Sequence, residues 1–122
     1  TTTVSGIPIA QFIDKATLDQ IVDRARNGGA EIVAQLKTGS AYYAPSAAAV
    51  QMAEAIVLDK KRVLPCSAWL QGEFGLKDVY CGVPCLLGRK GLERIIDIPL
   101  SADEMAALHK SAEAVRSVQA IV

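Results

Sequence analysis

The sequence predicts an α+β domain with long helices packed on an antiparallel three-stranded meander and a further helix at the C-terminus. Apolar residues recur at helical spacing in the first half of the chain, three apolar runs follow between residues 62 and 100, and helical spacing then returns. Because helices and strands are segregated, the pattern differs from a βαβ repeat. The 122 residues suffice for one domain with its own core.

The first helix is predicted over residues 16–37, where apolar side chains recur at steps of three, four and seven. Thr17, with Gln20 three positions later, resembles a capping box at its start. The Asn-Gly-Gly sequence at residues 27–29 would ordinarily break a helix, because each glycine costs about 1 kcal/mol relative to alanine. Since the apolar phase continues across it, we expect a kinked helix or two abutting ones, with the glycines allowing close approach of a neighbouring element.

The second helix is predicted to carry Pro45 in its first turn, where the N–H that proline lacks is not needed. It is expected to run to about Asp59. Its apolar residues at helical spacing predict a buried stripe made of Val50, Ala53, Ile56 and Val57.

The three apolar runs at residues 62–70, 78–87 and 92–100 are predicted to be the strands of the meander. Short connections that contain glycine separate them, as is typical of antiparallel hairpins. The first two strands are apolar on both faces, so both sides of that sheet are expected to be covered. Ser101 and Glu104 predict a capping box for the last helix. The buried stripe expected for that helix is Met105, Leu108, Ala112, Val115 and Val118.

Composition and charge argue against several classes of partner. The 13 basic and 13 acidic side chains cancel without a basic cluster, so no nucleic-acid partner is expected. No apolar stretch approaches the roughly 20 residues that span a bilayer, so no membrane partner is expected either. The three cysteines, an odd number, favour small core residues in a reducing, cytoplasmic setting over a disulfide framework. No metal site is expected, because the single histidine, His109, lies far along the chain from Cys66, Cys81 and Cys85.

Few residues carry recognisable chemistry. The sequence contains no nucleotide-binding glycine loop and no nucleophile elbow. His109 is expected on a partly exposed helix surface rather than as a general base, and Glu73 and Asp78 are expected to be solvated carboxylates beside a turn. The segment of residues 37–45 places hydroxyls and small residues beside a helix start. Such a break can line a pocket, but from the residues alone a turn packed with small residues is the favoured interpretation.

Six short motifs follow one another over nearly the whole chain: VSGIPI (4–9), RNGGAEIV (26–33), KTGSAYYAP (37–45), VLPCSA (63–68), GVPCLLG (82–88) and LHKSA (108–112). Together they resemble the C-terminal substrate domain of the lactate/malate dehydrogenase family, and within it the malate dehydrogenases of the lactate-dehydrogenase-like type. The resemblance implies an NAD-dependent oxidoreductase of the tricarboxylic acid cycle that interconverts (S)-malate and oxaloacetate by hydride transfer.

The catalytic histidine, aspartate and arginines of that family have no counterpart in this sequence, so no catalytic residue is assigned and the segment alone is expected to be inactive. The family's histidine immediately precedes the position that matches Thr1. Residues 1–122 are therefore expected to be the substrate domain of a longer protein. The N-terminal Rossmann domain, which binds most of the NAD, is expected to be absent from this chain and to be its partner.

The resemblance assigns the wall of the substrate pocket residue by residue. Ala41 matches a position where lactate dehydrogenases have a threonine, and Pro45 matches an isoleucine that packs against the nicotinamide ring. The small Ala41 side chain leaves room for the second carboxylate of oxaloacetate, which favours malate over lactate. Ser40 either supplies a hydroxyl nearby or packs. Ser40 and Ala41 are thus candidate substrate-binding residues, and Pro45 is a candidate cofactor-binding residue.

The family is oligomeric, so a homo-oligomer, tetramer or dimer, is expected, with the helix at 16–37 in a subunit contact. Two alternatives stay open: a lactate or other 2-hydroxy-acid dehydrogenase domain, and a non-catalytic dimerisation or ligand-binding module. Rates on oxaloacetate and pyruvate separate the first alternative from malate dehydrogenase. The intact mass of the source protein separates the second.

Overall fold

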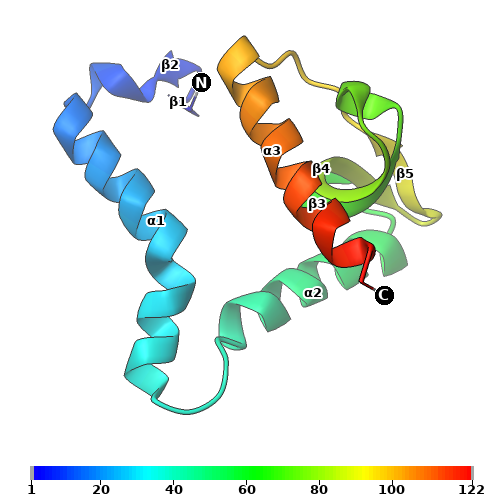
Figure 1. Ribbon diagram of the computed structural model, residues 1–122, viewed down its shortest axis with the longest axis horizontal. Coiled ribbons are helices and arrows are strands. Elements are labelled where there is room, and N and C mark those ends of the chain that lie inside the picture. The colour runs from blue at the N-terminus through cyan, green and yellow to red at the C-terminus, as the bar shows by residue number, and fades with distance from the viewer. Residues whose placement is uncertain (1, 122) are drawn as a thin grey trace. The chain divides into compact units, whose positions relative to one another are not determined.

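The computed structural model describes residues 2–121, and the chain divides into two compact units, Thr1–Ser46 and Ala47–Val122. Its three long helices and its antiparallel three-stranded sheet confirm the predicted α+β class (Figure 1). The elements follow the order β1 (Thr3–Val4), β2 (Ile7–Pro8), η1 (Ile9–Gln11), α1 (Lys15–Leu36), α2 (Tyr43–Val57), β3 (Arg62–Gln71), η2 (Glu73–Gly75), β4 (Lys77–Gly88), β5 (Gly91–Ile95) and α3 (Ala102–Gln119).

The N-terminal cap of α1 differs from the prediction. Asp14 is the N-cap, and its carboxylate accepts hydrogen bonds from the backbone N–H of Thr17 at 2.8 Å and from the Thr17 hydroxyl at 3.0 Å. These bonds hold the pKa of Asp14 below its ordinary value. The predicted capping box of Thr17 and Gln20 is therefore wrong. Thr17 donates to the cap instead of forming it, because Asp14, three positions earlier, is the stronger acceptor.

The α1 helix runs without interruption through the two glycines, so the prediction of two abutting helices is wrong. An ion pair between Arg24 and Glu31, with an N···O distance of 3.2 Å, spans them, and the Asn27 amide donates to the carbonyl of Asp23 at 3.0 Å. Among the described residues, no atom of another element lies within 4 Å of where a methyl group at Gly28 or Gly29 would be. The close approach expected at these glycines is therefore not seen.

The α2 helix carries Pro45 in its first turn, as predicted, and ends at Val57, two residues before the predicted end at Asp59. Its packed face differs from the expected stripe. Ala55 is fully buried and Met52 packs against the core, whereas Val50 and Val57 are 57% and 74% exposed. Ala53 is exposed as well. Since this helix is apolar on most sides, the spacing of apolar residues does not select the buried face.

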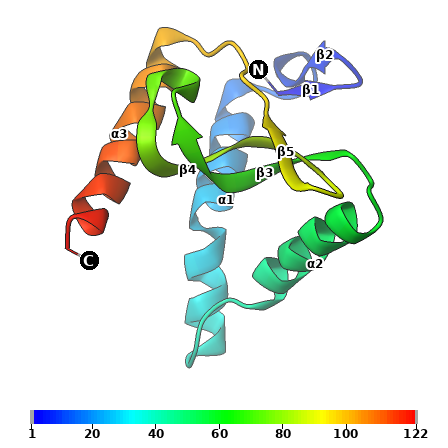
Figure 2. The same ribbon diagram turned by 90° about the vertical axis from the view of Figure 1, so that its right-hand side faces the viewer.

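The three strands of the second unit form the predicted antiparallel meander in the order β3-β4-β5 (Figure 2). Leu70 lies opposite Val79 and Cys66 lies opposite Val83. The third strand ends at Ile95 rather than near residue 100. The Ile96 N–H still donates to the Pro84 carbonyl at 2.8 Å, but the chain then leaves the sheet toward α3.

One face of this sheet is buried, and the other is exposed in this chain. The α2 and α3 helices each contribute an alanine, Ala55 and Ala112, to the cluster formed by the buried face. The opposite face exposes Val63, Trp69 and Tyr80. The prediction that both faces are covered is thus wrong for the described residues, because both helices join the same core. That core consists of Ala55, Ala68, Leu70, Phe74, Leu76, Val79, Cys81, Val83, Cys85, Leu87 and Ala112.

The capping box of α3 is confirmed. The Ser101 hydroxyl accepts from the Glu104 N–H at 3.3 Å, and the Glu104 carboxylate accepts from the Ser101 N–H at 2.9 Å. Ala112 is fully buried and marks the centre of the packed stripe. Val118 is 61% exposed, so the buried stripe ends one turn before the predicted end. A surface hollow lies between Val118 and Tyr80 of β4.

Replacing Ser101 with alanine is expected to lower the free energy of unfolding by about 1 kcal/mol, because the Glu104 N–H loses its partner. Urea denaturation of the complete protein measures the change. The matched control is Ser111→Ala on an exposed position of the same helix, where no cap is lost. Equal midpoints for wild type and Ser101→Ala would contradict the role of this cap.

Candidate functional site

The candidate site residues Ser40, Ala41 and Pro45 lie on the connection between α1 and α2 and in the first turn of α2. Lys37 and Gly39 both have positive φ, 61° and 85°, and the chain turns there after α1. Glycine takes a positive φ without strain, so Gly39 suits this turn. Ser40 and Pro45 are exposed, while Ala41 is half-buried.

Hydrogen bonds within the chain order the start of α2. The carbonyl of Tyr42 accepts from the Ser46 hydroxyl at 2.6 Å and from the Ser46 N–H at 2.9 Å. The exposed rings of Tyr42 and Tyr43 lie against each other with centroids 4.7 Å apart. Ordered small and aromatic groups of this kind suit a pocket wall that is fixed before a ligand arrives.

The same segment lacks groups for proton transfer at neutral pH. Between residues 37 and 46 the ionisable side chains are Lys37 and the two tyrosines, and the sequence there contains no carboxylate, histidine or cysteine. General acid–base chemistry needs a group that titrates near the working pH. The segment can therefore shape a binding site, but it offers no group for acid–base catalysis. The roles predicted for Ser40, Ala41 and Pro45 stay predictions.

His109 has a structural contact. Its Nε2 lies 2.9 Å from the carbonyl oxygen of Phe74, and because a carbonyl only accepts, this nitrogen donates its hydrogen. Phe74 is buried in the turn between β3 and β4 with a left-handed φ of 54°. His109 is half-buried as predicted, and its contact with this strained turn is one that the sequence did not reveal.

The turn carboxylates also serve local structure. Glu73 accepts the Gln71 N–H at 2.7 Å, which holds the pKa of that carboxyl below its usual range. Asp78 is exposed, in agreement with the expectation that it is solvated. Neither residue lies in one of the surface hollows described for this chain.

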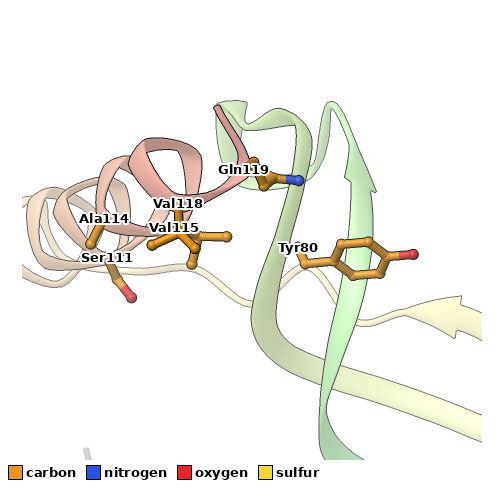
Figure 3. A pocket seen from close by; sticks show the side chains of 6 residues that line it. All are labelled: Tyr80, Ser111, Ala114, Val115, Val118 and Gln119. Atoms are coloured by element: carbon orange, nitrogen blue, oxygen red, sulfur yellow. The ribbon is translucent and has the colours of Figure 1, made fainter. Parts of the chain in front are cut away.

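A surface hollow of about 830 Å³ lies between α3 and β4 (Figure 3). Val115 and Val118 line it from the helix, and the Tyr80 ring extends away from them. Ser111, Ala114 and Gln119 complete the lining. No acidic or basic side chain lines this hollow within the described part of the chain, so it offers no catalytic group.

The helices of residues 2–121 include none that is long and apolar enough to cross a membrane.

Comparison with known proteins identifies the domain. A family profile described as lactate/malate dehydrogenase, alpha/beta C-terminal domain, matches residues 1–120. A malate dehydrogenase from Roseiflexus sp. (strain RS-1) is 66% identical over 116 residues, which cover 95% of this chain and 38% of that protein. This chain thus spans about two fifths of the length of that relative.

Solved structures agree with the sequence comparison. The malate dehydrogenase of Salinibacter ruber is 51% identical with a TM-score of 0.88, covering 94% of this chain and 37% of that one. The lactate dehydrogenase of Eimeria maxima is 39% identical with a TM-score of 0.92, covering 98% of this chain and 39% of that one. Both fold and sequence agree over nearly all of the described residues, and the chain therefore belongs to the lactate/malate dehydrogenase family, whose C-terminal domain it matches.

Proposed function

We propose that the complete protein is an NAD-dependent malate dehydrogenase, which interconverts (S)-malate and oxaloacetate, and that residues 1–122 form its substrate domain. The observation that carries this proposal is the 66% identity with a malate dehydrogenase over 95% of the chain. An N-terminal Rossmann domain would supply the catalytic histidine, aspartate and arginines. The segment alone would then be inactive, because its candidate wall contains no group for proton transfer.

The proposed work of this chain is to shape the substrate side of the cleft. Oxaloacetate carries a second carboxylate that pyruvate lacks, so its pocket needs more room. The Ala41 side chain is a single methyl group on an ordered connection, and Ser40 beside it is exposed. A larger side chain at Ala41 would occupy the space proposed for that carboxylate.

The described residues fit only one end of a dinucleotide. Pro45 is exposed in the first turn of α2 and offers a rigid apolar surface on which the nicotinamide ring would rest. Bound NAD would supply the hydride acceptor, and this chain would contribute Pro45 as a surface beside the nicotinamide ring. The phosphates require backbone N–H groups of a glycine-rich loop, which this sequence does not contain.

A lactate dehydrogenase is the second candidate. The Eimeria maxima structure is that of a lactate dehydrogenase with NADH and oxamate, and its TM-score of 0.92 exceeds the 0.88 of the Salinibacter ruber malate dehydrogenase. Because backbone similarity does not set substrate choice, we give more weight to the side chain at residue 41.

The complete protein is expected to oxidise NADH at least about tenfold faster with oxaloacetate than with pyruvate, because oxaloacetate carries a second carboxylate that pyruvate lacks. Absorbance of NADH in steady-state assays measures both rates. A preference for pyruvate would identify a lactate dehydrogenase instead. Absence of turnover with either substrate would support a non-catalytic module and end the proposal.

We also propose a homo-oligomer in the cytoplasm. Support for the oligomer comes from α1, whose exposed apolar side chains Ile21, Val22, Ile32 and Val33 find no cover within its own unit among the described residues. Cys66, Cys81 and Cys85 are free thiols, which fits a reducing compartment.

A further inference from the structure

Two sulfur atoms meet where α2 packs on β3, and the Cys85 thiol of β4 lies on the same face of the sheet. The Met52 thioether of α2 lies 3.6 Å from the Cys66 thiol of β3, measured from Sδ to Sγ. Cys66 lies opposite Val83 and Leu64 lies opposite Cys85, so Cys85 is a diagonal neighbour of Cys66 on the same face of the sheet. The Cys85 thiol points toward the Cys66 backbone, with its Sγ 3.9 Å from the carbonyl oxygen.

The electrostatic environment agrees with two adjacent thiols. Burial raises the pKa of the Cys85 thiol, and the neighbouring Cys66 thiol raises it further. Cys85 is fully buried, whereas Cys66 and Met52 are half-buried. A proton must therefore leave Cys85 before that sulfur can act as a thiolate ligand, and a cation bound there would stabilise the thiolate.

We propose that Met52, Cys66 and Cys85 form a three-sulfur binding site for a soft monovalent cation of the Cu(I) and Ag(I) class. Thiolate and thioether sulfurs favour soft metals, and Cu(I) is among them. Three sulfurs around one ion at about 2.3 Å stand roughly 4 Å apart, close to the spacing of Met52 and Cys66. The coordinating thiols release their protons to solvent, so no oxidant or reductant is consumed.

A surface hollow reaches Met52, one of the three proposed ligands. A hollow of about 100 Å³ opens beside Met52 between α2 and β3. Neither Cys66 nor Cys85 lines this hollow, so a cation that enters it would contact Met52 first. The residues that line it are Ala48, Gln51, Met52, Leu64 and Pro65.

Two other uses of these sulfurs fit less well. Diagonal neighbours in an antiparallel pair stand roughly 7–8 Å apart at Cα, and a disulfide is not closed beyond about 7 Å without backbone movement. Zinc prefers four nitrogen or thiolate ligands. The described residues contain no group of three or more His, Cys, Asp or Glu side chains placed to hold such an ion. The methionine thioether is what makes this a soft-cation site.

The test uses the complete protein, reduced and handled without oxygen, and titrated with Cu(I) in competition with bicinchoninate. The wild-type protein is expected to bind one more Cu(I) ion per chain than the Cys66→Ala variant. Met52→Leu, which keeps the volume of the side chain, is expected to weaken that binding at least about tenfold. X-ray absorption of the one-equivalent complex should give three sulfur ligands at about 2.3 Å.

Cys81→Ala is the matched control. Cys81 is a buried thiol and, like Cys85, a diagonal neighbour of Cys66, yet no hydrogen bond of its sulfur is found among the described residues. The Cys81→Ala variant is expected to bind Cu(I) as the wild-type protein does. Circular dichroism shows whether each variant is folded. The proposal is overturned if Cys66→Ala binds as much Cu(I) as wild type, or if Cys81→Ala loses as much as Cys66→Ala. Nitrogen or oxygen ligands in the absorption spectrum would overturn it too.

Discussion

Replacing Leu70 with alanine is expected to lower the free energy of unfolding by about 2–5 kcal/mol, the largest effect on stability that we expect from a single truncation. Leu70 is fully buried on β3 and lies opposite Val79, which is fully buried as well. Removing its branched end leaves a cavity that the closely packed sheet and helices cannot fill. Urea denaturation of the complete protein measures the loss.

Val63→Ala on the same strand is the matched control for Leu70→Ala. Val63 is 55% exposed on the opposite face of the sheet, so its truncation removes little buried surface. We expect it to cost less than about 1 kcal/mol. Similar losses at Leu70 and Val63 would show that the sheet buries both faces in the complete protein, contrary to the one-sided core described for this chain.

Replacing Ala41 with threonine is expected to lower kcat/KM for oxaloacetate by about tenfold or more, while the Kd for NADH stays near that of wild type. The added methyl and hydroxyl groups would occupy the space that we propose for the second carboxylate. Pyruvate lacks that group, so its kcat/KM should fall less or rise. Steady-state kinetics with both substrates and a fluorescence titration with NADH supply the measurements.

Ala106→Thr controls for the general cost of this change, because Ala106 is exposed on α3 and lies in the other unit. Its kinetics are expected to match those of wild type. Equal losses of oxaloacetate turnover and NADH binding in Ala41→Thr would contradict the assignment of Ala41 to the substrate wall. Retained turnover at a wild-type level would do the same.

Local signals in the sequence predicted the elements well. The Ser101 and Glu104 capping box, the proline in the first turn of α2 and the order of the three strands are all confirmed. Each depends on residues a few positions apart. Where two local signals competed, the prediction failed: Asp14 rather than Thr17 caps α1, and the helix continues through Gly28.

The burial of each face depended on partners that are distant in sequence. Spacing of apolar residues could not decide which side of α2 packs, since both Met52 and Val50 suit a core and only Met52 enters it. The contact between His109 and Phe74 likewise joins residues 35 positions apart. Such contacts follow from how whole elements dock, and the local pattern does not contain that information.

The candidate site divides in the same way. The sequence by itself determined that Ser40, Ala41 and Pro45 lie within one short segment and that this segment carries no proton-transfer group, because both facts concern neighbouring residues. Only the tertiary structure brought Met52 within 3.6 Å of Cys66 and placed Cys85 diagonally behind it. That arrangement requires the register of β3 against β4 and the rotation of α2, both of which are set by packing of the whole unit.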